Sequence, residues 1–381
     1  MSSALLHTPD RQHSDSIKWQ RYAGRDILPM WVADMDFAAP AEVVEALQAR
    51  IAQGMFGYTE PSASLHEAIV DGIARDHGWQ IEPDWIVFLP GVVSGFNLAC
   101  RLAGTPGDSV LTFPPIYPPV LTAPRNQERR LLRSELVLAG GHWEYDWEGL
   151  DTLLATQRAR EVVICNPHNP VGRVWSRDEL TRLAWYAEKH DWLICSDDIH
   201  CGLVLDPTRP YTPIAALDES IAQRTITLMA PSKTWNIPAL GCAFAVIPNA
   251  SLRKQYVAAG HGLTPEVNLL GLVACEAAYR HGDAWRQALL ARLRENAQRL
   301  HACVNALDGL SMTPVEATYL AWVDCRALGL AQPQKYFEQH GLGFSDGRDF
   351  GMEGFVRINF ACGPELLDEA LRRLDLAVRA A

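Results

Sequence analysis

The stretch TITLMAPSKTWNIPALGCAFAVI, residues 225–247, places one lysine between two apolar segments. The segments 225–230 and 242–247 are short, rich in β-branched and aromatic residues, and bounded by proline or glycine, which is typical of buried strands. Partial removal of Lys233 from water would lower its pKa and make its neutral amine available as a nucleophile. From these residues alone, a buried lysine paired with a carboxylate is an equally good interpretation.

The other lysines lie in different surroundings. Lysine and arginine together number 34, and only five of these residues are lysines. Four of the five occur in the polar contexts IKWQR, AEKHDW, LRKQY and PQKYFE. We expect solvated surface charges at these positions, which are Lys18, Lys189, Lys254 and Lys335.

Short apolar segments alternate with helical patterns over the first two thirds of the chain. Further strands are predicted at 85–89, 109–113, 162–165 and 192–196, and helices at 41–53, 65–77 and 177–190. The last helix has apolar residues at i, i+3, i+4 and i+7 and Ser176 as a candidate N-cap. Strands separated by helices predict an α/β domain with a mostly parallel sheet.

The pattern changes from about residue 264. A long helical stretch near 267–307 precedes a strand at 319–324, a helix at 333–340, a strand at 354–360 and a helix at 364–378. We therefore predict a large domain at 41–280 and a smaller α+β domain. The smaller domain is built from residues 281–381 and the N-terminal segment 1–40.

Polar groups follow most of the predicted strands of the large domain. They are GVVSG after 85–89, Tyr117 after 109–113, NPHNP after 162–165, Asp197 and His200 after 192–196, and Ser232 and Lys233 after 225–230. Ligands of open α/β sheets bind at the carboxyl ends of the strands. An amine, an acid, an amide, an aromatic ring and an anion cradle would converge there, as a phosphate-bearing aromatic aldehyde cofactor requires.

Composition excludes several classes of function. The net charge of −11 argues against nucleic-acid binding, because no basic surplus exists to neutralise phosphates. The N-terminal MSSALLHTPDRQHSDS lacks the apolar core of a signal peptide, and no stretch approaches about 18 uninterrupted apolar residues, so no membrane span is expected. Nine cysteines without a C-x-x-C pair indicate buried, reduced thiols in a cytoplasmic enzyme, not disulfides or a metal site.

Eight segments together point to a family. They are WVADMDF (31–37), FGYTEP (56–61), PGVVSG (90–95), PPIYPP (114–119), NPHNPVGRVW (166–175), SDDIH (196–200), APSKTWNIPAL (230–240) and VRINFAC (356–362). These segments occur in the family's order along nearly the whole chain. By them the chain resembles the fold-type I enzymes that depend on pyridoxal 5′-phosphate (PLP), the aminotransferase class I/II superfamily. Within it, the chain resembles the cystathionine β-lyase branch of the MalY/PatB kind.

The resemblance implies catalytic roles for Lys233, Tyr117 and Asp197. Lys233 would carry PLP as a Schiff base and act as the base that takes the Cα proton of the substrate. Asp197 would pair with the pyridine nitrogen and keep it protonated, and Tyr117 would stack on the ring. A helix N-cap at Asp197 and a core tyrosine at Tyr117 remain alternatives.

The resemblance also implies further contacts with the cofactor. The residues concerned are Val92, Val93, Asn169, His200, Ser232 and Tyr58. The valine N–H groups and the serine would hold the phosphate, Asn169 the 3′-oxygen of the ring, and the histidine would lie behind the residues that touch the ring. Tyr58 would reach the phosphate of a neighbouring subunit, which makes the protein a homodimer.

An amino-acid substrate is implied by Arg357 in the apolar segment FVRINFAC. A planar guanidinium suits the α-carboxylate, although an isolated arginine is more often a surface charge. WVADMDF, with Asp34, would line the mouth of the pocket and contact the substrate. Three positions depart from patterns of the superfamily: Asp198 replaces Glu, Trp235 replaces Phe, and Gly241 stands where many aminotransferases, but not the lyase branch, have arginine.

The expected reaction is the α,β-elimination of an S-substituted L-cysteine, such as cystathionine, to a thiol, pyruvate and ammonia. An aminotransferase would share the cofactor residues and is the alternative enzyme. A regulatory or interaction protein on the same fold is a third possibility. Lys233, Asp197 and Arg357 argue against it, because binding alone needs neither an electron sink nor a base.

Overall fold

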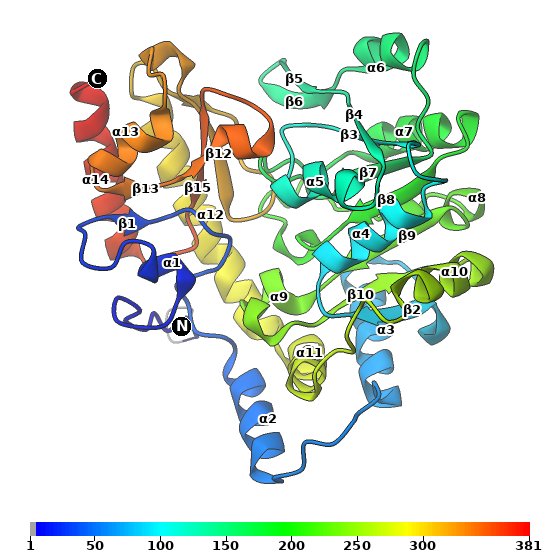
Figure 1. The fold of residues 1–381 in the computed structure, drawn as a ribbon. Coiled ribbons are helices and arrows are strands. Elements are labelled where there is room, and N and C mark those ends of the chain that lie inside the picture. Colours follow the sequence, from blue (N-terminus) through cyan, green and yellow to red (C-terminus); the bar gives the residue numbers. More distant parts are fainter. Residues whose placement is uncertain (1–4) are drawn as a thin grey trace.

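The computed structural model describes residues 5–381, which contain a seven-stranded sheet (Figure 1). Its strands, in spatial order, are β2 (Ile86–Leu89), β10 (Ala243–Val246), β9 (Thr225–Met229), β8 (Leu193–Asp197), β7 (Glu161–Cys165), β3 (Ser109–Thr112) and β4 (Arg130–Arg133). Strand β10 is antiparallel to both neighbours, and the pairs from β9 to β4 are parallel. The predicted α/β fold with a mostly parallel sheet is confirmed.

Helices cover both faces of this sheet. Every residue of β7 and β9 is buried, so these strands need apolar cover on both sides. One face packs against α4 (Val92–Leu102), α5 (Pro118–Asn126) and α10 (Ala250–Gly260), and the other against α6 (Trp147–Leu154) and α7 (Arg177–Lys189). The predicted cap of α7 is present, because the Ser176 hydroxyl accepts from the Glu179 N–H at 3.2 Å.

A second sheet lies in the C-terminal part of the chain. Its order is β11 (Ser311–Met312), β12 (Leu320–Asp324), β15 (Phe355–Asn359) and β14 (Ser345–Asp346). The helices of this part are α12 (Asp283–Asn305), α13 (Pro333–Gln339) and α14 (Pro364–Arg379). Strand β1 (Leu28–Pro29) pairs with β13 (Leu342–Gly343), which brings the N-terminal segment beside this part. The domain division near residue 280 stays a prediction.

The long helical stretch expected near 267–307 is two helices, α11 (Leu269–His281) and α12. Gly282 separates them, and the Trp235 indole N–H donates to its carbonyl at 3.0 Å. A Cβ atom at Gly282 would lie 2.4 Å from the indole nitrogen. The indole of Trp235 is larger than the phenyl ring that the family pattern has at this position, and it fits because Gly282 has no side chain.

The remaining α-helices and strands lie outside the two larger sheets. They are α1 (Ile17–Gln20), α2 (Ala41–Ala52), α3 (Ala63–His77), the hairpin β5 (Leu136–Ala139) and β6 (His142–Tyr145), α8 (Glu219–Ala222) and α9 (Pro231–Thr234). Helices α2 and α3 agree with prediction, whereas the hairpin was not predicted. No helix within residues 5–381 is long and apolar enough to cross a membrane.

One lysine prediction is wrong. Lys189, Lys254 and Lys335 are exposed as expected, but Lys18 is only 1% exposed. Its ammonium lies 2.7 Å from the carboxylate of Asp36. A polar sequence context does not reveal a partner that the fold brings from 18 residues away.

Candidate functional site

A cavity of about 480 Å³ lies at the carboxyl ends of the large sheet's parallel strands. Most of the residues singled out in the sequence line it, and they come from different elements of the fold. They are Val92, Val93, Tyr117, Asn169, Asp197, His200, Ser232, Lys233 and Arg357. The fold thus brings together groups that are far apart in the sequence.

Lys233 lies in α9, directly after β9. Its Nζ donates to the carbonyl of Ala33 at 2.7 Å, and the Tyr319 hydroxyl donates to the same carbonyl at 3.0 Å. Burial, reinforced by the charge of Arg357, lowers the pKa of Lys233 from 10.5 to about 8. A useful fraction of the amine is therefore neutral near physiological pH.

Asp197 is buried at the end of β8. Within residues 5–381 its carboxylate accepts one long hydrogen bond, from the Ile199 N–H at 3.4 Å. Burial raises the pKa of Asp197 to about 7. A buried carboxylate with so few donors is stabilised by a cationic N–H partner, which a protonated pyridine ring provides.

His200 and Tyr117 are held in their neutral forms. Burial, with the nearby charges of Lys233 and Arg357, lowers the pKa of His200 to about 3. The Nδ1 atom of His200 is buried and has no partner among the described residues. Burial raises the pKa of Tyr117, so its ring stays a neutral phenol beside the cavity.

Arg357 lies on the buried strand β15. Its Nη1 donates to Asn169 Oδ1 at 3.1 Å, and its Nη2 donates to the Trp31 carbonyl at 2.7 Å. The Nε atom is buried without a partner in the described chain. Burial lowers the pKa of Arg357 only to about 10, so the side chain remains a cation that can bind a carboxylate.

The N-terminus of α4 forms an anion cradle. Its N-cap, Gly91, offers no side-chain hydrogen bond, and an added Cβ there would meet no atom within 4 Å. The N–H groups of Val92 and Val93 are thus free to bind a phosphate, and Ser232 lines the same cavity. Gly241, which also lines it with φ of 57°, adds no charge.

The arrangement fits PLP. The free N–H groups suit the phosphate, the underbonded Asp197 carboxylate suits the pyridine nitrogen, and the Lys233 amine suits the aldehyde. The N–H groups, the carboxylate and the amine all border the same cavity.

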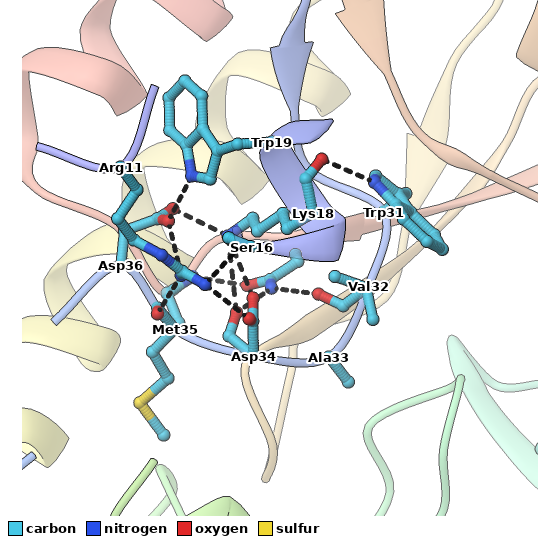
Figure 2. Close-up of polar contacts among 12 residues, drawn as sticks. Arg11, Ser16, Lys18, Trp19, Trp31, Val32, Ala33, Asp34, Met35 and Asp36 are labelled. Atoms are coloured by element: carbon cyan, nitrogen blue, oxygen red, sulfur yellow. Dashed lines mark hydrogen bonds and ion pairs between the residues drawn. The ribbon is translucent and has the colours of Figure 1, made fainter. Parts of the chain in front are cut away.

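Two predicted residues lie outside this cavity. Asp34 is absent from its lining, because the carboxylate accepts from Arg11 at 2.8 Å and faces Lys18 (Figure 2). Tyr58 lies fully exposed in the loop between α2 and α3. Within one chain, neither side chain lines the pocket that holds Lys233.

The segment that contains Asp34 nevertheless closes the cavity. Trp31, Val32 and Ala33 line it, as predicted for the mouth of the pocket. The Asn359 amide donates to the carbonyls of Val32 at 2.7 Å and Asp34 at 2.6 Å. Residues near the C-terminus therefore hold this N-terminal segment in place.

Two of the three departures from the family pattern lie away from the cavity. The carboxylate of Asp198 accepts from the hydroxyls of Ser196 and Tyr211, and its residue is absent from the cavity lining. Trp235 is absent as well. Of the three departures, only Gly241 lines the cavity.

Sequence reasoning missed several residues of the site. They are Tyr319, Ser345, Asp349 and Phe350. Ala33 belongs to the predicted mouth of the pocket, but it contacts Lys233 through its backbone carbonyl, a role that side-chain chemistry cannot reveal. Asp349 and Phe350 belong to a short 3₁₀ helix, Gly347–Phe350, that follows no strand of the large sheet.

Comparisons with known proteins agree with this geometry. The model of the family "Aminotransferase class I and II" matches residues 25–374. Cystathionine beta-lyase PatB of Bacillus subtilis is 34% identical, and the alignment covers 97% of this chain and 98% of that protein. The solved structure of OvoB is 46% identical, with a TM-score of 0.95 and 98% of each chain covered. Cystalysin from Treponema denticola, whose structure contains PLP, is 31% identical, with a TM-score of 0.92 and coverage of 99% and 98%.

Proposed function

Since the chain belongs to the aminotransferase class I and II family, we propose that it is a PLP-dependent carbon–sulfur β-lyase. With one water molecule, it converts an S-substituted L-cysteine, such as cystathionine, into a thiol, pyruvate and ammonia. The observation that carries this function is the Lys233 amine, with its lowered pKa, in one cavity with Asp197 and Arg357. The name of the Bacillus subtilis relative favours the lyase over an aminotransferase.

When bound, PLP supplies an aldehyde that bonds to amines and a protonated ring that withdraws electrons from the substrate's Cα. Lys233 holds the cofactor and then takes the Cα proton on its Nζ. Asp197 holds the proton on the ring nitrogen, and Tyr117 packs against the ring. Val92, Val93 and Ser232 hold the phosphate.

Arg357 orients the substrate. Asn169 and the Trp31 carbonyl fix its guanidinium, so that the unpartnered Nε can bind the α-carboxylate. Ala33 accepts from the Lys233 amine and supports the position from which the amine reaches the Cα proton.

The test is the release of pyruvate and thiol from cystathionine, cystine and S-alkylcysteines by the purified holoenzyme. Lys233→Ala should abolish both turnover and the visible absorption of the bound cofactor, whereas Arg357→Ala should mainly raise KM. An aminotransferase would instead release one equivalent of 2-oxo acid per site and stop until another 2-oxo acid is added. No pyruvate from any of these substrates would contradict the lyase.

The protein is further proposed to be a homodimer. Met55, Phe56 and Tyr58 are 69%, 61% and 105% exposed and lie in the loop that projects between α2 and α3 (Figure 1). Exposed apolar side chains that gather in one segment are typical of a protein interface. Tyr58 would then complete the site of the partner.

A cytoplasmic location is proposed as well, on the ground that all nine cysteines are free.

A further inference from the structure

Among the charged residues that line the cavity around Lys233, Asp349 is the one to which the proposed function assigns no role. The charged residues that line this cavity are Asp197, Lys233, Asp349 and Arg357. The cofactor engages Asp197 and Lys233, and the substrate's α-carboxylate engages Arg357. Asp349 therefore remains for the variable part of the substrate.

The fold holds Asp349 at this place. Its 3₁₀ helix, Gly347–Phe350, is capped by the Asp346 carboxylate, which accepts from the Arg348 N–H at 3.0 Å. The Phe350 carbonyl accepts from the Ile116 N–H at 3.1 Å, which ties the helix to the start of α5. The backbone of Asp349 is thus held at the cavity wall, and its side chain is exposed at the mouth.

The carboxylate of Asp349 is also free of ion pairs within residues 5–381. The neighbouring Arg348 binds Asp346 at 2.5 Å instead. Arg357 donates to Asn169, Trp31 and Ser345, although the charge of Asp349 acts on it and partly offsets the lowering of its pKa. Asp349 is therefore close enough to Arg357 to interact with its charge, but it forms no ion pair among the described residues.

A neighbouring cavity is lined by three aspartates, Asp10, Asp15 and Asp34, and by two cations, Arg11 and Lys233. It has a volume of about 790 Å³ and shares Val32, Ala33, Lys233 and Pro238 with the first. Arg11 lines it, but its guanidinium donates to Asp34 at 2.8 Å and Asp36 at 3.1 Å (Figure 2). Asp10 and Asp15 also line this cavity, so the cation there is already neutralised.

We propose that Asp349 determines specificity by favouring S-substituted cysteines whose leaving thiol carries a positive charge, such as an ammonium group. A leaving group that extends from Lys233 lies near Asp349 on one side and near the second cavity, lined by Asp10 and Asp15, on the other. The cations that line these cavities are already engaged: Lys233 by the cofactor, Arg357 by the α-carboxylate, and Arg11 by Asp34 and Asp36. An anionic leaving group is repelled for the same reason. The proposal rests on the proposed lyase function.

The experiment compares the wild-type holoenzyme with Asp349→Asn on three amino acids of similar size. S-(2-aminoethyl)-L-cysteine, S-propyl-L-cysteine and S-carboxymethyl-L-cysteine carry a cationic, a neutral and an anionic leaving group. Each comparison is made between two enzymes on one substrate, so differences in the reactivity of the thiols cancel. We expect kcat/KM for pyruvate release to fall about fivefold for the first, to stay unchanged for the second and to rise about fivefold for the third.

Glu353→Gln is the matched control, because it removes one charge from the same loop outside the cavity lining. It should leave all three values unchanged, whereas Asp349→Lys should reverse the preference. An equal change on all three substrates would assign Asp349 to the shared α-carboxylate and overturn the proposal, as would no change at all.

The two proposals can fail separately. If the wild type releases pyruvate from none of the substrates, the lyase function is wrong. Dissociation constants of the same amino acids, read from the change in the visible absorption of the holoenzyme, still test the preference for positive charge. Equal effects of Asp349→Asn on the three constants would then refute the role of Asp349.

Discussion

Lys18 and Asp36 form an ion pair that is almost completely removed from water, with exposed side-chain fractions of 1% and 3%. Lys18→Met removes the closer of two cations that contact the buried carboxylate, and Arg11 remains at 3.1 Å, so the cost should lie at or below the lower end of the about 3–5 kcal/mol expected for breaking a buried pair. Urea denaturation should show this loss. The control is Arg25→Met, whose pair with Glu338 is 53% exposed on the arginine side and should cost less than about 1 kcal/mol. Equal losses in the two variants would contradict the prediction.

The lowered pKa of Lys233 predicts how the cofactor-free enzyme reacts. Its amine is protonated below about pH 8 and neutral above, whereas an ordinary lysine changes near 10.5. Labelling of Lys233 by pyridoxal, trapped with borohydride and quantified by mass spectrometry, should be half-maximal near pH 8. A midpoint near that of free lysine would disprove the shift.

The same shift affects stability. Between the two pKa values the unfolded chain binds a proton that the native chain has lost, so the contribution of Lys233 to the unfolding free energy rises with pH. The cost of burying the charged amine is full below about pH 8 and disappears above the unfolded pKa.

Residues that follow an apolar strand could be found from the sequence. Lys233 and Asp197 each end such a segment, and the carboxyl edge of a parallel sheet collects them. Asp34 and Lys18 could not be placed in this way. Their partners depend on how the N-terminal segment folds onto itself, and nothing in their local sequence records that fold.

At the scale of elements, the N-terminus of α4 makes a specific prediction. Val93→Pro removes one N–H from the cradle while keeping the first helical turn, where proline is tolerated. We expect PLP to bind about tenfold more weakly, because a hydrogen bond to a charged group is lost. Pyridoxal, which lacks the phosphate, should bind as before. Absorbance titration of the cofactor-free enzyme measures both.

Val93→Ala keeps the N–H and should bind PLP normally. If Val93→Pro weakens PLP and pyridoxal to the same degree, the helix has been disturbed and the cradle assignment is not supported.

Strand positions were largely predictable, but the direction of β10 was not. Buried strands show similar apolar patterns in either orientation, so the sequence does not reveal that β10 runs against its neighbours. The break between α11 and α12 was missed for a related reason. One glycine in a helical pattern is often tolerated, and only the packing of Trp235 against Gly282 makes it a boundary.

For the whole molecule, the proposed dimer predicts complementation between inactive variants. If Tyr58 serves the partner's site, a mixed dimer of Lys233→Ala and Tyr58→Ala subunits contains one intact site. Random reassociation should then restore roughly a quarter of the wild-type activity. Each variant alone, taken through the same unfolding and refolding, is the control. No recovery from mixed dimers would indicate that Tyr58 does not act across the interface.

The hold of Asn359 and Arg357 on the segment near Val32 also sets an order of events during synthesis. The segment leaves the ribosome well before the two anchors, which lie on β15. The segment near Val32 can therefore take its place over the cavity only after β15 has been synthesised. A nascent chain that already carries Lys233 but not yet β15 lacks part of the cavity wall, so it cannot load the cofactor into a finished site.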